Sequence, residues 1–294
     1  MSEGIVSCKL MGGLGNQLFQ IFATMAYGIK TKRKIVFPYS ESLNTGIQRK
    51  TYWNNFLSSI KMMTTYNKKH EIENAMIYRY IPCSEKGFGY DTLPYYNDQK
   101  EIILTGYFQS YKYFESEKEV LLKLVRFNHH QDAAYEEFGT TYLNSNDYKI
   151  SMHFRLGDYK NIQECHPLMS YEYYENSLSY LCEKRGGSNK ITVLYFCQKE
   201  DNKVVQSIVD RLMTKFPHVD FCKVNDNIDD WKQLVLMSCC NDNIIANSTF
   251  SWWGAYFNNK PSRIVCYPSK WFGPRIDHNT DDLFPSDWVK ISVV

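Results

Sequence analysis

The sequence predicts an α/β protein built on parallel sheets, and two patterns carry this prediction. The chain opens with an apolar strand at 4–10, a glycine-rich turn, an amphipathic helix to about residue 30 and a second strand at 34–38, which together form a βαβ unit. Beyond residue 147, strands and helices alternate regularly, as they do in a doubly wound sheet. A chain of 294 residues is long enough for two domains of ordinary size.

The N-terminal half is less regular after its opening unit. Four apolar side chains fall on one face of the first helix: Leu18, Phe22, Met25 and Ile29. The segment 40–100 is rich in Tyr and Asn and shows no clear period. We expect a strand at 101–108 and then a helix with Leu121, Leu122 and Val125 on its apolar side. The polar stretch 144–147 marks a candidate boundary, so we divide the chain into an N-terminal domain, 1–146, and a C-terminal domain, 147–294.

The C-terminal half gives the clearer pattern. We expect strands at 150–154, 191–197, 219–224, 243–246 and 263–267. The intervening helices run from Ser170 to Gly186-Gly187, through Val205 and Leu212 to Pro217, from Asp230 to Ser238, and onward from Phe250. Open α/β sheets bind ligands beyond the carboxyl ends of their strands, which directs attention to the loops 12–17, 153–166 and 247–251.

Composition excludes several classes of protein. A hydrophobic content of 44% supplies a core, and a net charge of +2 gives no footprint for nucleic acid. Nine cysteines without C-x-x-C spacing favour buried, reduced thiols. No run approaches the roughly 18–20 apolar residues of a membrane span, and the N-terminus does not read as a signal peptide. We expect a soluble, cytoplasmic protein without a transmembrane anchor, acting in solution or peripherally at the cytosolic side of a membrane.

The first chemically informative segment is His153-Phe154-Arg155-Leu156-Gly157-Asp158, where a strand ends beside a glycine turn. The planar fork of Arg155 suits a diphosphate, because it binds two oxygens at once and stays charged. A cation held against a leaving diphosphate stabilises the transition state more than the ground state. The alternative is an ion pair between Arg155 and Asp158 that only fixes the loop.

The second segment, Asn247-Ser248-Thr249-Phe250-Ser251, follows a buried strand and opens a helix. Backbone N–H groups and hydroxyls converge at such a helix N-terminus, which makes it an anion site. The alternative is that Ser248 or Thr249 is an ordinary N-cap.

The third segment, Gly12-Gly13-Leu14-Gly15-Asn16-Gln17, lets a backbone approach a ligand closely, or forms a tight strand-to-helix turn and nothing more. It is not G-x-G-x-x-G, and the chain contains no P-loop sequence. The chain also lacks an Asp-x-Asp pair and any metal-ligand spacing, so a diphosphate here must be neutralised by cationic side chains and helix ends.

Four motifs together resemble the α-1,2-fucosyltransferases of glycosyltransferase family 11. They are Gly12–Gln20, Gly106–Ser110, His153–Asp158 and Ile244–Ala255. They keep the family's order and span most of the chain. The resemblance implies a GT-B architecture, in which two Rossmann-like domains face each other across a cleft. It also implies an inverting, metal-independent galactoside α-1,2-fucosyltransferase with no cofactor, which transfers L-fucose from GDP-β-L-fucose to O2 of a galactose-containing acceptor glycan.

The resemblance also assigns roles to residues. Arg155 would bind the β-phosphate, His153 would lie near the nucleotide, and Asp158 would brace the loop. Asn247, Ser248, Thr249, Phe250 and Ser251 would line the diphosphate and nucleoside. Gly13, Asn16 and Gln17 would face the cleft from the N-terminal domain.

Two positions depart from the family pattern. Leu156 stands where a second Arg is frequent, which weakens charge compensation or moves it to a residue such as Lys160. Gln233 stands where an acidic residue is usual, which affects guanine recognition.

A base must reach the acceptor hydroxyl, and Asp158, Glu164 and His166 are the candidates in the 153–166 loop. We favour Glu164, because a carboxylate thought to be the base of the related α-1,6-fucosyltransferases similarly precedes a His-Pro pair. The alternative for Glu164 is a solvated loop carboxylate.

Three other functions stay open at this point. They are transfer of another GDP-linked deoxyhexose, a dinucleotide-dependent oxidoreductase and a non-catalytic sugar-binding protein. The glycine turn does not fit the dinucleotide pattern, and the phosphate-gripping residues count against the sugar-binding protein. We expect acceptor specificity to lie in the segment 40–100 and in the loop tip 160–165.

Overall fold

The computed structural model describes residues 4–44, 47–96, 100–143, 146–186 and 190–293. Two residues of the expected linker, 144 and 145, and the helix stop at Gly187 lie outside these ranges. The chain forms two compact units: Met1–His130 with His278–Pro285, and Gln131–Asp277 with Ser286–Val294. The chain therefore passes from one unit to the other within helix α4 (Phe127–Phe138), ahead of the boundary at 146/147 drawn from the sequence.

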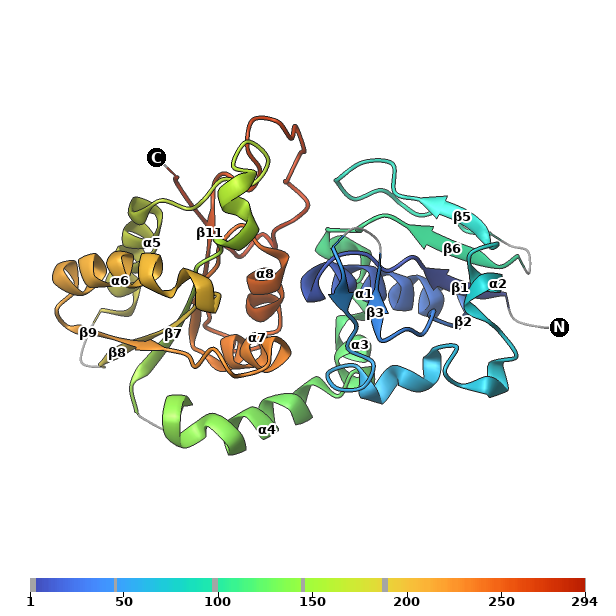
Figure 1. Cartoon of the computed structure of the whole chain (residues 1–294), viewed down its shortest axis with the longest axis horizontal. Helices are drawn as coiled ribbons and strands as arrows, with labels where there is room; N and C mark the ends of the chain where they lie inside the picture. Colours follow the sequence, from blue (N-terminus) through green and yellow to red (C-terminus); the bar gives the residue numbers. More distant parts are fainter. Residues whose placement is uncertain (1–3, 45–46, 97–99, 144–145, 187–189, 294) are drawn as a thin grey trace. The chain divides into compact units, whose positions relative to one another are not determined.

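The first unit is built on a four-stranded parallel sheet in the order β2-β1-β6-β5. Its strands are β1 (Ile5–Cys8), β2 (Lys34–Ile35), β5 (Ile81–Ser84) and β6 (Ile102–Thr105). Helix α1 (Leu14–Thr31) connects β1 to β2 and packs against β1 (Figure 1). The predicted βαβ opening is confirmed.

Helix α1 is buried over almost its whole length, and most of its buried side chains are apolar. Leu18 and Phe22 are fully buried, and Phe22 meets Phe114 edge to face with 5.8 Å between ring centroids. The helix ends at Lys32, which adopts the left-handed conformation with φ 54° and donates its N–H to the carbonyls of the last turn.

The segment 40–100, which shows no hydrophobic period in the sequence, folds into elements that are too short for a helical or strand period to develop. They are β3 (Ser42–Leu43) paired antiparallel with β4 (Arg49–Lys50), 3-10 turns at Ser58–Met63 and Lys68–His70, helix α2 (Asn74–Ile77) and β5. Two more 3-10 turns, Tyr111–Tyr113 and Glu115–Glu117, precede helix α3 (Lys118–Leu124).

The second unit contains a six-stranded parallel sheet in the order β12-β11-β10-β7-β8-β9. The strands are β7 (Tyr148–His153), β8 (Ile191–Phe196), β9 (Val219–Lys223), β10 (Asp242–Ile244), β11 (Val265–Pro268) and β12 (Val289–Ile291). The helices are α5 (Tyr171–Arg185), α6 (Asn202–Lys215), α7 (Asp230–Cys239) and α8 (Thr249–Tyr256), with 3-10 turns at Gly157–Asn161 and Lys199–Asp201 and a π-helical turn at Gly139–Leu143. The predicted doubly wound sheet is confirmed, and β12 is an addition to it.

The core of the second unit lies on both faces of this sheet. Ile150, Met152 and Val193 of the central strands are fully buried and pack with side chains of α5 and α6. Helices α7 and α8 contact each other on the opposite face, where Trp252 and Trp253 are fully buried (Figure 1). The sheet is thus covered by helices on both sides, which explains why its strands read as continuous apolar runs.

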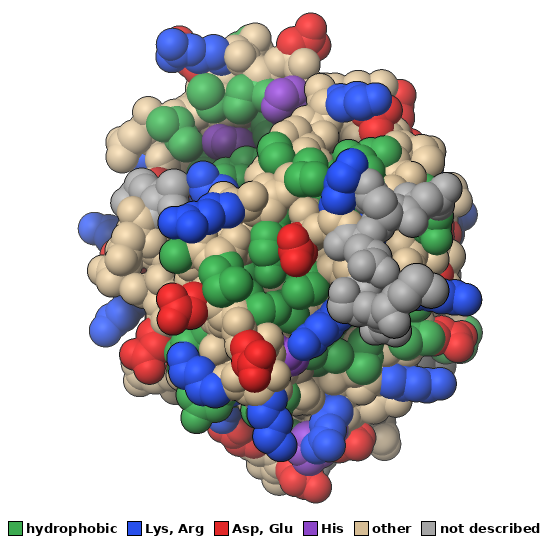
Figure 2. All heavy atoms as spheres, turned by 90° about the vertical axis from the view of Figure 1, so that its right-hand side faces the viewer, with side chains coloured by type: hydrophobic (Ala, Val, Ile, Leu, Met, Phe, Trp, Pro, Cys, Tyr) green, Lys and Arg blue, Asp and Glu red, His purple; other side chains and the backbone are tan. Residues whose placement is uncertain are grey.

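Among the helices of the described ranges, none has both the length and the apolar character needed to cross a membrane. All nine cysteines are free thiols, and burial raises the pKa of Cys8 to about 12. On the face shown in Figure 2, hydrophobic side chains lie exposed between basic and acidic ones, and the two signs of charge are interspersed.

Candidate functional site

The two segments singled out from the sequence of the second unit start from neighbouring strands. β7 and β10 pair in parallel, with Met152 opposite Ile244, so the loops that follow them leave the sheet side by side. Numbered within the unit, the strand order is 6-5-4-1-2-3, and β7 and β10 are strands 1 and 4. The connections diverge at this point, which opens a crevice at the carboxyl edge. This is the ligand-binding place of a Rossmann-like sheet.

Arg155 follows β7 directly and its guanidinium is held in place by three groups. One terminal nitrogen donates to Oε1 of Gln198 at 3.0 Å, the other is paired with the carboxylate of Asp158, and the guanidinium carbon lies 4.6 Å from the ring centroid of Tyr159. The side chain of Arg155 is only 20% exposed. The ion pair with Asp158, given above as the structural alternative, is therefore present. Together with the contacts to Gln198 and Tyr159, it also orients the guanidinium of Arg155 at the switch point.

The loop that carries Arg155 is anchored by a residue that the sequence did not single out. Asp201 is fully buried, accepts a hydrogen bond from the N–H of Gly157 at 2.8 Å, and forms an ion pair of 2.6 Å with Lys160. Gly157 has φ +43°, and a Cβ there would lie 2.0 Å from Oε1 of Gln198. Gln198 and Asp201 both follow β8, the strand next to β7, so their position at the same sheet edge was the signal that could have identified them.

His153 is the last residue of β7 and is buried. Its backbone carbonyl accepts from the Tyr174 hydroxyl at 3.2 Å, and its ring centroid lies 5.5 Å from that of Phe250. Burial, and then the nearby Arg155 charge, lower the pKa of His153 to about 3. Its ring is therefore neutral at pH 7, and Nδ1 is buried with no hydrogen-bond partner among the described atoms. A polar atom in this situation is expected to gain a partner when the site is filled.

The N-terminus of α8 lies in the second loop. Ser248 occupies the N-cap position in an extended conformation, but its side chain makes no capping hydrogen bond. Ser248 is thus the N-cap residue, as the alternative had it, but its hydroxyl is not used for capping. The half-buried Thr249 and Phe250 begin the first turn. The positive end of the helix dipole is directed at this loop, as in an anion site.

Asn247 and Ser251, expected to line the donor, are almost fully buried and bond to the protein itself. Asn247 donates to the carbonyls of Pro167 and Trp271 at 2.9 and 3.1 Å, and so fixes two neighbouring loops. The Ser251 hydroxyl donates to the carbonyl of Ser248 at 3.3 Å. In this structure both side chains shape the loop, and their contact with a donor stays a prediction.

Glu164 projects into solvent. Its side chain is 79% exposed, and its carboxylate lies 3.9 Å from the guanidinium of Arg275. The backbone around it is fixed, because its carbonyl accepts from the N–H of Arg275 at 2.9 Å and the carbonyl of Cys165 accepts from Gly273 at 2.8 Å. The solvated state considered for this carboxylate is therefore the one seen, and a role as base stays a prediction.

His166 stacks on the ring that Arg155 covers. The centroids of His166 and Tyr159 are 4.7 Å apart at 21°, and Phe272 lies 5.6 Å from His166. Burial lowers the pKa of His166, with Asp158 opposing the shift and Arg155 adding to it. Tyr159, missed by sequence analysis in a chain with 23 tyrosines, also donates its hydroxyl to the carbonyl of Asn247 at 3.3 Å and so joins the two loops.

In the first unit, the glycine turn forms the N-terminus of α1. Gly12 has φ +76°, whereas Gly13 has an ordinary φ of −77°, and no described atom lies within 4 Å of where its Cβ would be. Gln17 is buried and donates to the carbonyls of Gly12 and Lys50 at 3.0 and 2.9 Å, so it fixes the turn. Asn16 accepts from the Gln109 amide at 3.1 Å.

The two departures from the family pattern have structural explanations. Leu156 is 6% exposed and belongs to the apolar core of the second unit. Lys160, considered as its substitute, is engaged with Asp201. Gln233 donates to the carbonyl of Ile228 at 2.8 Å, within the turn that precedes α7.

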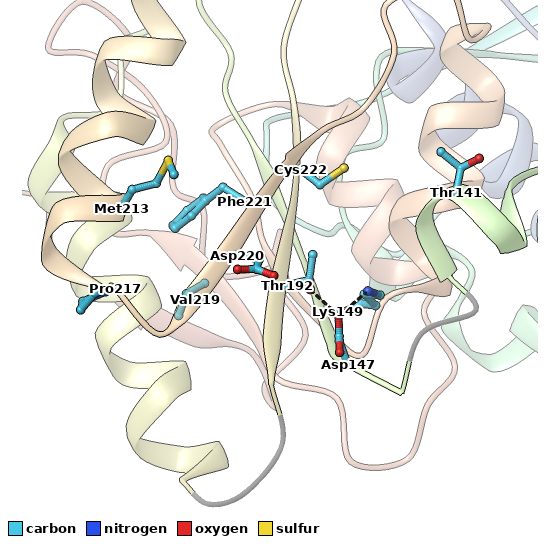
Figure 3. A pocket seen from close by; sticks show the side chains of 10 residues that line it. All are labelled: Thr141, Asp147, Lys149, Thr192, Met213, Pro217, Val219, Asp220, Phe221 and Cys222. Atoms are coloured by element: carbon cyan, nitrogen blue, oxygen red, sulfur yellow. Dashed lines mark hydrogen bonds and ion pairs between the residues drawn. The ribbon is translucent and has the colours of Figure 1, made fainter.

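A separate pocket of about 490 Å³ lies at the opposite, amino edge of the second sheet. In Figure 3, Met213 and Pro217 lie on one side of β9, and Asp147 is contacted by Thr192 at 3.0 Å and by Lys149 at 3.5 Å. Its position at the amino ends of the strands separates it from the switch point. Within the described ranges, no group of three or more His, Cys, Asp or Glu side chains is placed to hold a metal ion.

Comparison with known proteins gives a consistent result. The model of glycosyl transferase family 11 matches residues 2–292. The O-antigen biosynthesis glycosyltransferase WbnK of Escherichia coli is 28% identical and covers 97% of this chain and 99% of its own length. An α-1,2-colitosyltransferase of Escherichia coli is also 28% identical, covering 98% of this chain and 99% of its own length.

Among solved structures, that of POFUT1 in complex with GDP-fucose superimposes with a TM-score of 0.50 over 90% of this chain and 98% of the other, at 12% identity. This likeness concerns the fold, and it agrees with the two parallel α/β units described above. The expected GT-B class is confirmed. With the family model matching nearly the whole length, the chain belongs to glycosyl transferase family 11 and is a glycosyltransferase.

Proposed function

We propose that the protein is an inverting glycosyltransferase that moves L-fucose from GDP-β-L-fucose to O2 of a galactoside. The observation that carries the proposal is that Arg155 and the N-terminus of α8 follow neighbouring strands at the switch point of the second sheet, and that Tyr159 contacts Arg155 and donates to the carbonyl of Asn247 just before α8. A guanidinium and a helix dipole together neutralise a nucleoside diphosphate. The colitosyltransferase relative, named for an α-1,2 linkage, supports the same linkage here.

The proposed reaction is a single displacement. The acceptor hydroxyl attacks C1 of fucose from the face opposite GDP, the bond from C1 to the β-phosphate oxygen breaks, and the configuration at C1 inverts. Negative charge develops on the leaving diphosphate, where Arg155 and the first turn of α8 stabilise it. His153, neutral at pH 7, donates or accepts through one ring nitrogen beside the nucleotide without adding charge.

We assign the base to Glu164. The proton of the acceptor hydroxyl passes to its carboxylate as the new bond forms. Since this side chain is exposed and its backbone is fixed by Gly273 and Arg275, an acceptor can reach it without rearrangement of the loop. Asp158 is assigned to positioning Arg155 rather than to proton transfer.

The identity of the donor sugar has a second candidate. The relative named as an α-1,2-colitosyltransferase supports this second candidate, transfer of another GDP-linked deoxyhexose in place of fucose. Turnover measured with GDP-fucose and GDP-colitose against one galactoside panel separates the two. A clear preference for GDP-colitose would replace fucose and leave the site unchanged.

We further propose that transfer needs no metal, and that the protein acts in the cytoplasm or peripherally at the cytosolic face of a membrane. The cationic and helix-end groups around Arg155 supply the compensation that a divalent ion would otherwise give. Turnover unchanged by EDTA supports this, while restoration by Mg²⁺ or Mn²⁺ of activity lost to EDTA would overturn it.

Product analysis is the decisive experiment. Incubation with GDP-fucose and β-galactosides should release GDP and give a product whose new linkage to O2 is read by NMR. A GDP-induced rise in Tm without any product from either donor would instead support a non-catalytic sugar-binding protein.

A further inference from the structure

A second pocket, of about 630 Å³, lies within the first unit and takes no part in the site described above. Lys9 and Leu10, which follow β1, form part of its wall, together with Thr105 at the end of β6. The pocket therefore lies at the carboxyl edge of the first sheet, the edge from which the glycine turn 12–17 also leaves. Its volume is in the range of small-molecule binding sites.

Two tyrosines form part of the apolar surface of the pocket, together with Leu10, Leu43, Pro82 and Ile103. Tyr80 packs against the small core cluster of Val36, Ile77 and Ile103, so its ring is fixed in position. Tyr78 is 55% exposed and lies in the pocket wall without being needed to fill the core. An exposed tyrosine beside a cavity presents a flat apolar face and a hydroxyl to a ligand.

The polar part of the lining is made of groups that bond to hydroxyls. Ser40, Ser42, Asn44 and Thr105 contribute three hydroxyls and an amide. Lys9 supplies the one charge among the described lining residues, and its side chain is exposed. A nucleoside diphosphate would call for more cationic or helix-end groups than one lysine. A neutral ligand with many hydroxyls and apolar C–H faces matches this lining.

We propose that this pocket binds the acceptor oligosaccharide. The inference rests on the proposed function, which requires a galactose-containing acceptor. Two of the four wall segments come from 40–44 and 78–82, within the irregular region where the sequence predicts acceptor specificity. The tyrosine faces pack on the C–H face of a pyranose ring, while Lys9 and the hydroxyls bond to its oxygens.

The test uses the full-length chain and the β-galactosides lactose, N-acetyllactosamine and lacto-N-biose. Tyr78→Ala should raise the acceptor KM about tenfold, as truncation of an aromatic anchor does, with a smaller effect on kcat. Tyr78→Phe keeps the ring and should restore most of the affinity. Lys9→Met should also raise the acceptor KM, by roughly three- to tenfold.

Tyr95→Ala is the matched control. Tyr95 is 65% exposed in the same unit, next to Pro94, whose carbonyl accepts from Tyr27 near the C-terminal end of α1. This variant should leave the acceptor KM unchanged. In all four variants the GDP-induced rise in Tm and the slow hydrolysis of GDP-fucose without acceptor should equal those of the wild type.

The outcomes separate this inference from the proposed function. Unchanged acceptor KM in Tyr78→Ala and Lys9→Met, or an equal rise in Tyr95→Ala, would overturn the pocket assignment. A wild-type protein that neither responds to GDP nor hydrolyses the sugar nucleotide would overturn the proposed function. In that case, lactose binding seen by saturation-transfer NMR and lost in Tyr78→Ala would still support the pocket, and binding retained in the variant would refute it.

Discussion

Replacement of Arg155 by alanine tests the central claim, and the structure sets the expected size of the effect. The partner Asp158 is 44% exposed, so the ion pair contributes about 0–1 kcal/mol to folding. The contact with the Tyr159 ring adds about 0.5–1 kcal/mol. Loss of the hydrogen bond to Gln198 adds about 0.5–1.5 kcal/mol. The free energy of unfolding should therefore fall by no more than about 3.5 kcal/mol, and the variant should remain folded.

The effect on turnover should be much larger. Removal of one donor to a developing oxyanion typically costs about 2.7–4 kcal/mol, or about 10²–10³ in kcat. Arg155→Lys keeps the charge but loses the planar fork, so it should regain only part of this rate. GDP release from GDP-fucose with a saturating galactoside measures turnover, and chemical denaturation measures stability on the same samples.

Arg263 provides the control for a general loss of an arginine. It pairs with an exposed aspartate, Asp287, at 3.1 Å and is 17% exposed, close to the values for Arg155, but it precedes β11 at the amino edge of the sheet. Arg263→Ala should keep near-normal turnover. Comparable turnover in Arg155→Ala and the wild type, or an equal loss in both alanine variants, would refute the reasoning.

Three further predictions follow from the same geometry. Glu164→Gln should lower kcat while the GDP-induced shift in Tm stays intact, because an exposed carboxylate is removed without disturbing its fixed backbone. Gly13→Ala should change Tm little, because a Cβ there meets open space in the protein, but it should lower activity if a ligand fills that space. Gly12→Ala should instead lower the free energy of unfolding by about 1 kcal/mol or more, because Gly12 has a positive φ. Burial lowers the pKa of His153 to about 3. Between about pH 6.5 and 3, the unfolded state therefore binds a proton that the folded state does not, and the free energy of unfolding should fall as the pH decreases through that window.

Each of these predictions has a defined failure. Unchanged kcat in Glu164→Gln would remove that residue as the base. Full activity in Gly13→Ala would leave the turn a purely structural feature. For the pH effect, the free energy of unfolding is measured at a series of pH values for the wild type and for His153→Asn. Below about pH 6.5 it should fall less steeply in the variant, and an equal fall in both proteins would contradict the assignment.

The second unit was predictable because its signals are local and redundant. Buried parallel strands give apolar runs, and the loops after β7 and β10 carry unusual polar residues, so both the sheet and the two halves of the site could be located. The ion pair of Arg155 with Asp158 was an alternative read from the sequence, but the sequence could not show that Gln198 also holds Arg155, because Gln198 follows a different strand. Asp201 was missed for the same reason: its burial and its bond to Gly157 arise only when β7 and β8 pair.

The first unit was predictable only at its start. Helix α1 has a long apolar surface, whereas the elements between 40 and 100 are too short for either period to develop. Their positions are instead fixed by contacts across the chain, such as the hydrogen bond from the Asn74 side chain to the carbonyl of Tyr39 at 2.7 Å. Two of the four wall segments of the 630 Å³ pocket come from this region, so the lining of that pocket could not be assembled from the sequence.

The return of His278–Pro285 to the first unit limits how this enzyme can be divided. Asp282 accepts from the N–H of Tyr90 at 3.1 Å, is paired with Lys112, and offers its carbonyl to Ser110 at 2.7 Å. An expressed fragment that stops after α4 would lose all three bonds from its own fold. Chimaeras that exchange the second unit between relatives must therefore keep His278–Pro285 with the first unit. An exchange made at a single cut would remove this segment from the unit that it stabilises.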